Sequence, residues 1–134
     1  MSHVIMASII STLFILAWLS SLGYSLFVCP EVCHCSEPAR IVDCSSSGLS
    51  FVPKVQDNTL RLYLGDNDIA NLTSLSFSKL HKLTYLIISN NRISHITEDT
   101  FHGLTSLKYL VLDSNRITTL PKRLLRSQHQ LRTL

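Results

Sequence analysis

The chain has 134 residues, enough for one small domain after any targeting segment is removed. Hydrophobic residues make up 46% of it and charged residues 16%, and the formal net charge is +3. The basic residues near the C-terminus have no aromatic residues between them, so the sequence gives no support to nucleic-acid binding by base stacking.

Residues 1–25 are predicted to be a secretory signal peptide. Positions 4–28 carry no charged side chain, and small residues near their end suit cleavage after Gly23 or Ser25. An uncleaved signal anchor is the alternative, because such a run can cross a bilayer core about 30 Å thick. We therefore expect a secreted, extracellular protein, or in the alternative a protein anchored at the cell surface.

Residues 26–58 are predicted to form a cysteine-rich cap. This segment holds all four cysteines, and their spacing is Cys29-x3-Cys33-x-Cys35-x8-Cys44. An even number of cysteines behind a signal sequence indicates disulfides formed in an oxidising compartment. A bond between Cys33 and Cys35 is disfavoured by disulfide geometry. The residues alone leave open Cys29–Cys35 with Cys33–Cys44, or Cys29–Cys33 with Cys35–Cys44. A zinc site around His34 is disfavoured by secretion.

Residues 59–134 are predicted to contain repeats of 24 residues, three complete and a fourth truncated. The frame L-x-x-L-x-I-x-x-N runs from Leu83 to Asn91 and returns one period before and one period after. A fixed period of this length with this frame is typical of a leucine-rich repeat. The other copies hold Thr59, Leu62, Leu64 and Asn67, then Leu107, Leu110, Leu112 and Asn115, and a last copy that begins at Leu131.

Each repeat is predicted to be one coil of an α/β leucine-rich repeat solenoid, a short horseshoe. The L-x-x-L-x-L part forms a short strand, and successive strands pair in parallel to make a concave sheet. An asparagine ends each strand, and its amide can both donate and accept hydrogen bonds to neighbouring turns. We expect a buried ladder of Asn67, Asn91 and Asn115.

The remainder of each coil is expected to pack a convex side that is irregular or 3₁₀-helical. Phe77 and Phe101 are predicted to stack one coil apart within the core. The other inward positions are predicted to be Ile69, Leu72 and Leu80 in the first coil, Ile93, Ile96 and Leu104 in the second, and Ile117, Leu120 and Leu125 in the third.

The strand positions that point outward are not needed by the core, so they are candidates for binding a partner. Aromatic residues and arginine are favoured at protein interfaces. The alternative is that these residues have no binding role and that aromatic and β-branched residues simply suit strands. The predicted binding residues are Arg61, Tyr63, Tyr85, Ile87, Tyr109, Val111 and Asp113, with Gly65 and Ser89 beside Asp113 in a third outward row.

Two features point to glycans. The sequon Asn71-Leu72-Thr73 predicts N-glycosylation of Asn71 in a secreted protein. The chain from Ser114 onward carries basic residues and no acid, so Lys122, Arg123 and Arg126 could bind heparan-sulfate-type glycans. A solvated outer face is the simpler interpretation of that charge.

No catalytic residue, metal ligand or cofactor site is predicted. The sequence has no G-x-S-x-G, no H-E-x-x-H and no phosphate-binding glycine-rich loop. We expect protein recognition without catalysis. A matrix-structural component that binds glycans or fibrils, and the N-terminal arm of a larger enzyme, are the alternatives.

The cap residues resemble the N-terminal cap of extracellular leucine-rich repeat proteins. The resemblance rests on Cys29-Pro30, Cys33, Cys35, Val42-Asp43-Cys44, Gly48-Leu49 and Val52-Pro53. It implies the pairing Cys29–Cys35 with Cys33–Cys44, and binding of partners on the concave face. Slit proteins, small leucine-rich proteoglycans and neuronal leucine-rich repeat receptors have similar segments, and residues 120–125 look most like Slit.

The C-terminal end of the third coil is predicted to leave apolar surface uncovered, and such surface is typical of an interface. We therefore expect the chain to be a fragment of a longer protein. A short chain that dimerises through this end is the alternative.

Overall fold

The computed structural model describes Phe14, Ile15, Ala17, Trp18 and residues 29–134. The first four are helical, and the rest of the predicted signal peptide lies outside the described residues. Within the part of the chain that is described, no helix has the length and apolar character needed to cross a membrane.

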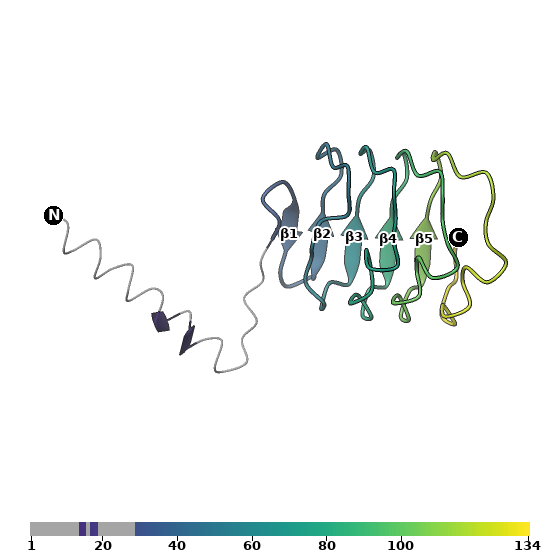
Figure 1. Ribbon diagram of the computed structural model, residues 1–134. Coiled ribbons are helices and arrows are strands. Elements are labelled where there is room, and N and C mark those ends of the chain that lie inside the picture. The colour runs from purple at the N-terminus through teal and green to yellow at the C-terminus, as the bar shows by residue number, and fades with distance from the viewer. Residues whose placement is uncertain (1–13, 16, 19–28) are drawn as a thin grey trace.

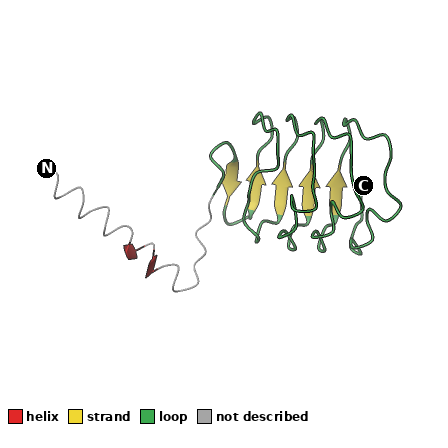
Figure 2. Ribbon diagram, in the orientation of Figure 1, coloured by secondary structure: helices red, strands yellow, loops and turns green. Residues whose placement is uncertain are grey.

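Residues 29–134 form a single sheet with turns at both ends of its strands (Figure 1). The strands are β1 (His34–Ser36), β2 (Ile41–Asp43), β3 (Arg61–Tyr63), β4 (Tyr85–Ile87) and β5 (Tyr109–Val111), and they lie side by side in chain order. The first strand is antiparallel to its neighbour, and the other four are parallel (Figure 2). The predicted parallel sheet is therefore confirmed.

The repeat frame places its leucines in register inside the solenoid. Leu62 pairs with Leu86 and Leu86 with Leu110, and all three side chains are fully buried. Phe77 and Phe101 stack with their ring centroids 5.8 Å apart. Each coil contributes one layer of side chains to a continuous core, and burial of these side chains is the main favourable term in the stability of the domain.

The cap is a shorter coil that continues the sheet. Val42 pairs with Leu62 at an offset of 20 positions, whereas Leu62 and Leu86 are 24 positions apart. Disulfides join Cys29 to Cys35 and Cys33 to Cys44, the pairing that the family resemblance implies. Cys44 is fully buried at the position that Leu64 and Ile88 hold in the first two repeats. A cystine thus fills part of the core of a segment too small to bury many apolar side chains.

The third coil departs from the predicted packing. Leu120 was expected to point inward but is 51% exposed, and Leu125 is only half-buried. Leu124 is buried instead, with 2% of its surface exposed. The prediction for Leu120 is therefore wrong, whereas Leu125 points inward as predicted and packs against the core without being fully buried.

The convex turn of the third coil differs from that of the second in its side-chain hydrogen bonds. In the second coil, the Thr97 amide donates to Oγ1 of Thr100 at 3.0 Å, and the Thr100 amide donates to the Thr97 carbonyl at 3.2 Å. In the third coil, Pro121 and Leu124 occupy these two places. The Leu124 amide still donates to the Pro121 carbonyl at 3.1 Å, so the backbone turn is kept. Proline has no amide hydrogen and leucine has no hydroxyl, so the side-chain bond of the second coil is lost.

The convex side was expected to be irregular or 3₁₀-helical, and it is irregular. Residues 29–134 contain turns and bends there but no α-helix or 3₁₀-helix. Coils approach closely on this side: a Cβ added at Gly103 would lie 2.7 Å from Cα of Ser78. A glycine is therefore required where the second coil passes the first.

Candidate protein-binding face

The open face of the sheet carries two rows of side chains that run across the coils. The first row holds Arg61, Tyr85 and Tyr109, which are paired in register. The two tyrosine rings stack with centroids 4.4 Å apart, and Cζ of Arg61 lies 5.9 Å from the Tyr85 centroid. A cation over a ring at this distance is favourable, so the row is a preorganised stack rather than three independent side chains.

The second row is largely apolar. It holds Tyr63, Ile87 and Val111, which are paired in register, and all three are half-buried. Asp43 of β2 continues this row toward the cap and is exposed. Together the six side chains of β3, β4 and β5 make what we call the sheet face, an aromatic and aliphatic surface with a charged neighbour at one end.

The third predicted row is flatter than expected. Gly65 was placed on the outside but is buried, and a Cβ there would lie 3.5 Å from Oγ of Ser89. Ser89 is half-buried, and Asp113 is exposed at the far end of the row. Of this row, Asp113 alone presents a charged group.

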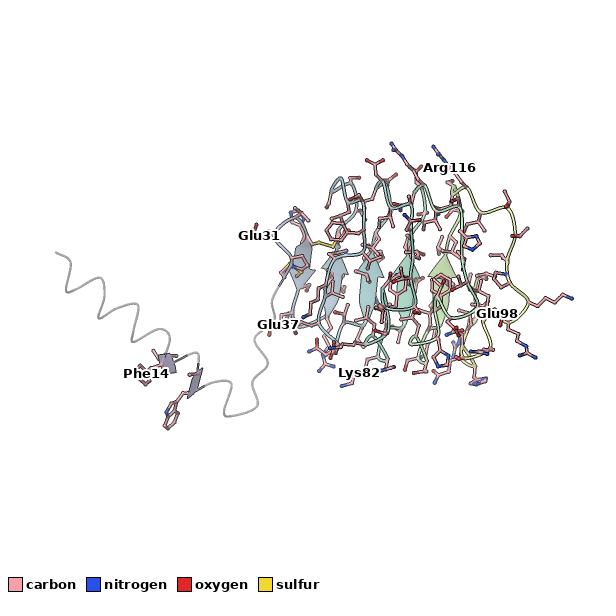
Figure 3. The ribbon with its side chains drawn as sticks, in the orientation of Figure 1. Phe14, Glu31, Glu37, Lys82, Glu98 and Arg116 are labelled. Atoms are coloured by element: carbon pink, nitrogen blue, oxygen red, sulfur yellow. A yellow bond between two sulfur atoms is a disulfide. The ribbon has the colours of Figure 1, made fainter. Side chains whose placement is uncertain are left out.

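A polar rim borders the face at the edge toward which the parallel strands point. Asp66, Asn90 and Ser114 have φ of 56°, 54° and 54°, the left-handed conformation that turns the chain sharply after each strand. Nδ2 of Asn90 donates to Oδ1 of Asp66. Two positions later in each coil come Asp68, Arg92 and Arg116. Arg92 and Asp68 form an ion pair of 2.8 Å, and Arg116 extends from the same edge (Figure 3).

The predicted asparagine ladder supports the face from behind. Oδ1 of Asn91 accepts from the Ile69 amide at 3.0 Å, while its Nδ2 donates to the Leu64 carbonyl at 2.8 Å. Asn67 makes equivalent bonds to the Leu49 amide and the Cys44 carbonyl in the cap. Asn115 does the same with the second coil but is half-buried. Because each amide bonds two coils, the ladder fixes their spacing.

The two predicted glycan features lie away from the sheet face. Asn71 and Thr73 are exposed, with Leu72 buried between them. Lys122 and Arg123 are exposed, and Arg126 forms an ion pair of 2.8 Å with Asp99 of the previous coil. The sequence interpretation of an acid-free basic end missed this ion pair, because Asp99 is 27 positions earlier and meets Arg126 only through the coiling.

Histidines on the convex turns also make contacts that no motif indicated. Nδ1 of His81 donates to the Gly103 carbonyl at 2.8 Å, and Nδ1 of His102 lies 3.0 Å from Oγ of Ser127. Among the residues with described positions, no three His, Cys, Asp or Glu side chains gather as a metal site. These contacts join coils and leave the sheet face as the best-formed candidate surface.

Family models match the chain over nearly all of this domain. Residues 57–117 and 82–134 match the leucine rich repeat, and residues 28–56 match the leucine rich repeat N-terminal domain. A solved structure of human 5T4 (Wnt-activated inhibitory factor 1, trophoblast glycoprotein) is similar with a TM-score of 0.66 and 33% identity. That similarity covers 70% of this chain and 36% of the other.

Curated relatives match shorter parts. Biglycan of Canis lupus familiaris is 42% identical over 62 residues, which are 46% of this chain and 16% of biglycan. Chondroadherin of Mus musculus is 36% identical over 74 residues, covering 55% and 21% of the two chains. The chain thus spans about a fifth or less of these relatives. Because the repeat model matches more than half of its residues, the chain belongs to the leucine-rich repeat family.

Proposed function

We propose that this chain is an extracellular or cell-surface recognition module that binds a protein partner through its sheet face. The observation that carries the proposal is the row of Arg61, Tyr85 and Tyr109, stacked in register on a surface that the core does not use. We propose no catalysis by these residues.

The chemistry of the face supports a protein partner. Tyrosine and arginine give large contact areas with few rotatable bonds and are enriched among residues that dominate binding energy. Ile87 and Val111 add apolar surface beside them, and the rim of Asp68, Arg92 and Arg116 adds charges that can orient a partner. A human protein named TLR4 interactor with leucine rich repeats supports this role, since it is 38% identical over 64 residues, which are 44% of this chain and 8% of that protein.

The stacked rings also reduce the entropic cost of binding. Tyr85 and Tyr109 hold each other 4.4 Å apart before any partner arrives. Side chains that are already ordered lose less conformational freedom when they are covered, which is the advantage of a preorganised surface. The backbone beneath them is fixed by the sheet and by the asparagine ladder.

Capture from a panel of secreted and cell-surface ectodomains, displayed multivalently, tests the proposal. We expect Tyr85→Ala with Tyr109→Ala to be secreted normally and to lose capture by at least about tenfold, because these are anchor side chains. Lys79→Ala with Lys82→Ala is the matched control, since both lysines are exposed and Lys82 lies at the opposite edge of the sheet (Figure 3). Equal capture by the tyrosine variant would reject the assignment.

A glycan-binding matrix role is the second candidate. Lys122 and Arg123 are exposed and have no ion pair within residues 29–134. Two cations give weak, salt-sensitive attraction to sulfated chains. Retention on heparin that disappears in Lys122→Glu with Arg123→Glu favours this role, and elution of the unchanged protein without added salt rejects it. Arg126 contributes less, because Asp99 neutralises it.

A further inference from the structure

A lateral row of residues runs across the coils beside the sheet. Asn71 and His95 form a parallel backbone bridge, so they lie side by side in consecutive coils. The cap supplies the preceding member of this row. The Leu49 carbonyl accepts from the Asp68 amide at 2.8 Å, as the Ile69 carbonyl accepts from the Arg92 amide at 3.0 Å. Leu49 therefore corresponds to Ile69, and counting two positions on in each coil aligns Phe51 with Asn71.

Phe51 is an exposed aromatic residue that the core does not explain. Its side chain is 66% exposed, while Leu49 and Val52 on either side pack into or against the core. An exposed phenylalanine lacks the favourable burial that its ring could give. A ring in this place is informative because the next residue in the row carries a sequon.

Asn71 is presented for modification. Asn71 and Thr73 are exposed, and burial of Leu72 between them fixes the alternation that turns both outward. In N-glycosylation, Nδ2 of the asparagine loses a proton and bonds the anomeric carbon of an oligosaccharide, whose lipid diphosphate carrier leaves. We take this transfer as the first step, because the sequence predicts it.

We propose that Phe51 is a platform for this glycan, and that the first N-acetylglucosamine on Asn71 packs across the Phe51 ring. The Asp68 amide donates to the Leu49 carbonyl at 2.8 Å, so the two coils lie side by side just before Phe51 and Asn71. Neighbouring strands of a parallel sheet lie about 4.8 Å apart, and at a similar spacing the first sugar on Asn71 can reach the Phe51 ring. The C–H groups of the sugar meet the electron-rich ring face, and both lose apolar contact with water. His95 flanks Asn71 on the other side but is a polar ring. The inference rests on glycosylation of Asn71 and is independent of the sheet face.

A double-mutant cycle on protein secreted from animal cells tests this platform. Full removal of the glycan by an amidase should lower the Tm of the unchanged protein by about 4 °C, the shift that a 1 kcal/mol contact produces in a domain of this size. An endoglycosidase that leaves one N-acetylglucosamine should leave the Tm nearly unchanged. In Phe51→Ser, both treatments should have no effect on Tm.

Two controls separate the platform from a general effect of the glycan. His95→Ala should keep the full Tm shift on amidase treatment. Leu75→Ser removes another exposed apolar side chain, 79% exposed, and should keep it too. An equal amidase effect in Phe51→Ser and in the unchanged protein would overturn the proposal.

A direct measurement removes any dependence on how the variants fold. In protein trimmed to one N-acetylglucosamine, we expect NMR cross-peaks between the Phe51 ring protons and the sugar protons, with sugar resonances shifted upfield by the ring. Absence of these cross-peaks would overturn the proposal, as would mass spectrometry that finds Asn71 unmodified. Neither readout involves a protein partner, so loss of the proposed binding function leaves this test unaffected.

Discussion

The second coil (residues 83–106) and the third coil (residues 107–130) have the same frame but different interiors. Ile88, Ile93 and Phe101 of the second coil are fully buried. Their counterparts 24 positions later, Leu112, Ile117 and Leu125, are half-buried. The second coil lies between two complete coils. The third has a complete coil on one side and, within residues 29–134, only residues 131–134 on the other, where Thr133 bridges to Tyr109. The comparison teaches that the repeat frame directs these side chains inward, and that a complete coil on each side is needed to bury them fully.

The largest expected difference concerns the aromatic stack. We expect Phe101→Ala to lower the free energy of unfolding by about 3–5 kcal/mol, because it empties the middle of the core and removes the ring that Phe77 contacts. Leu125→Ala should cost about 1–2 kcal/mol, since its side chain is only half-buried. Urea denaturation followed by circular dichroism measures both. Equal losses would break the comparison.

The next difference lies on the convex turn. Ile96→Ala should cost about 2–4 kcal/mol, because Ile96 is 4% exposed and packs in the core. Leu120→Ala should change stability by less than about 0.5 kcal/mol, because more than half of its surface is in water. The same denaturation experiment applies. A loss above about 2 kcal/mol for Leu120→Ala would show that Leu120 packs inward after all.

The asparagine ladder gives a smaller contrast. Asn91→Ala should cost about 2–3 kcal/mol, because it leaves the buried Ile69 amide without its acceptor. Asn115→Ala should cost about 1 kcal/mol, because Asn115 is half-buried and water can enter the place that its side chain leaves. Native-state hydrogen exchange at the amides of Ile69 and Ile93 distinguishes the two. Similar protection in both variants would argue against a role for burial.

The smallest effect is expected to be a gain. Gln128 occupies the place of Leu104, and its Oε1 is buried without a hydrogen-bond partner. Its Nε2 donates to the carbonyls of Phe101 and Leu104, which already accept from backbone amides. Gln128→Leu should therefore stabilise the protein by about 1 kcal/mol. A lower Tm for this variant would mean that the hydrogen bonds from Nε2 stabilise the protein by more than the unpaired Oε1 destabilises it.

Most of the fold could be predicted from the sequence because a solenoid repeats one local solution. The period of 24 residues gave the strand register, the buried leucines of the first two coils and the position of each ladder asparagine. The third coil was less predictable, because its burial depends on turn chemistry. Pro121 and Leu124 replace the threonine pair of the second coil, and a hydrophobic pattern alone does not show that the side-chain hydrogen bond of that pair is lost.

The candidate site was predictable in outline. Alternation along the strands identified Tyr85, Ile87 and the other outward residues, but stacking of Tyr85 on Tyr109 depends on rotamers that sequence does not show. The ion pairs Asp68–Arg92 and Asp99–Arg126 join residues 24 and 27 positions apart, and they form only after coiling. The disulfide pairing stayed open from the residues alone, since spacing does not state which sulfurs meet.

Hydroxyl-radical footprinting of the protein, free and bound to a partner captured from the ectodomain panel, tests the central claim most directly. The account predicts that binding lowers oxidation of Tyr63, Tyr85 and Tyr109, which lie on the sheet face, and leaves Leu75 and His81 unchanged. Protection of Leu75 and His81 with no change at the three tyrosines would contradict it.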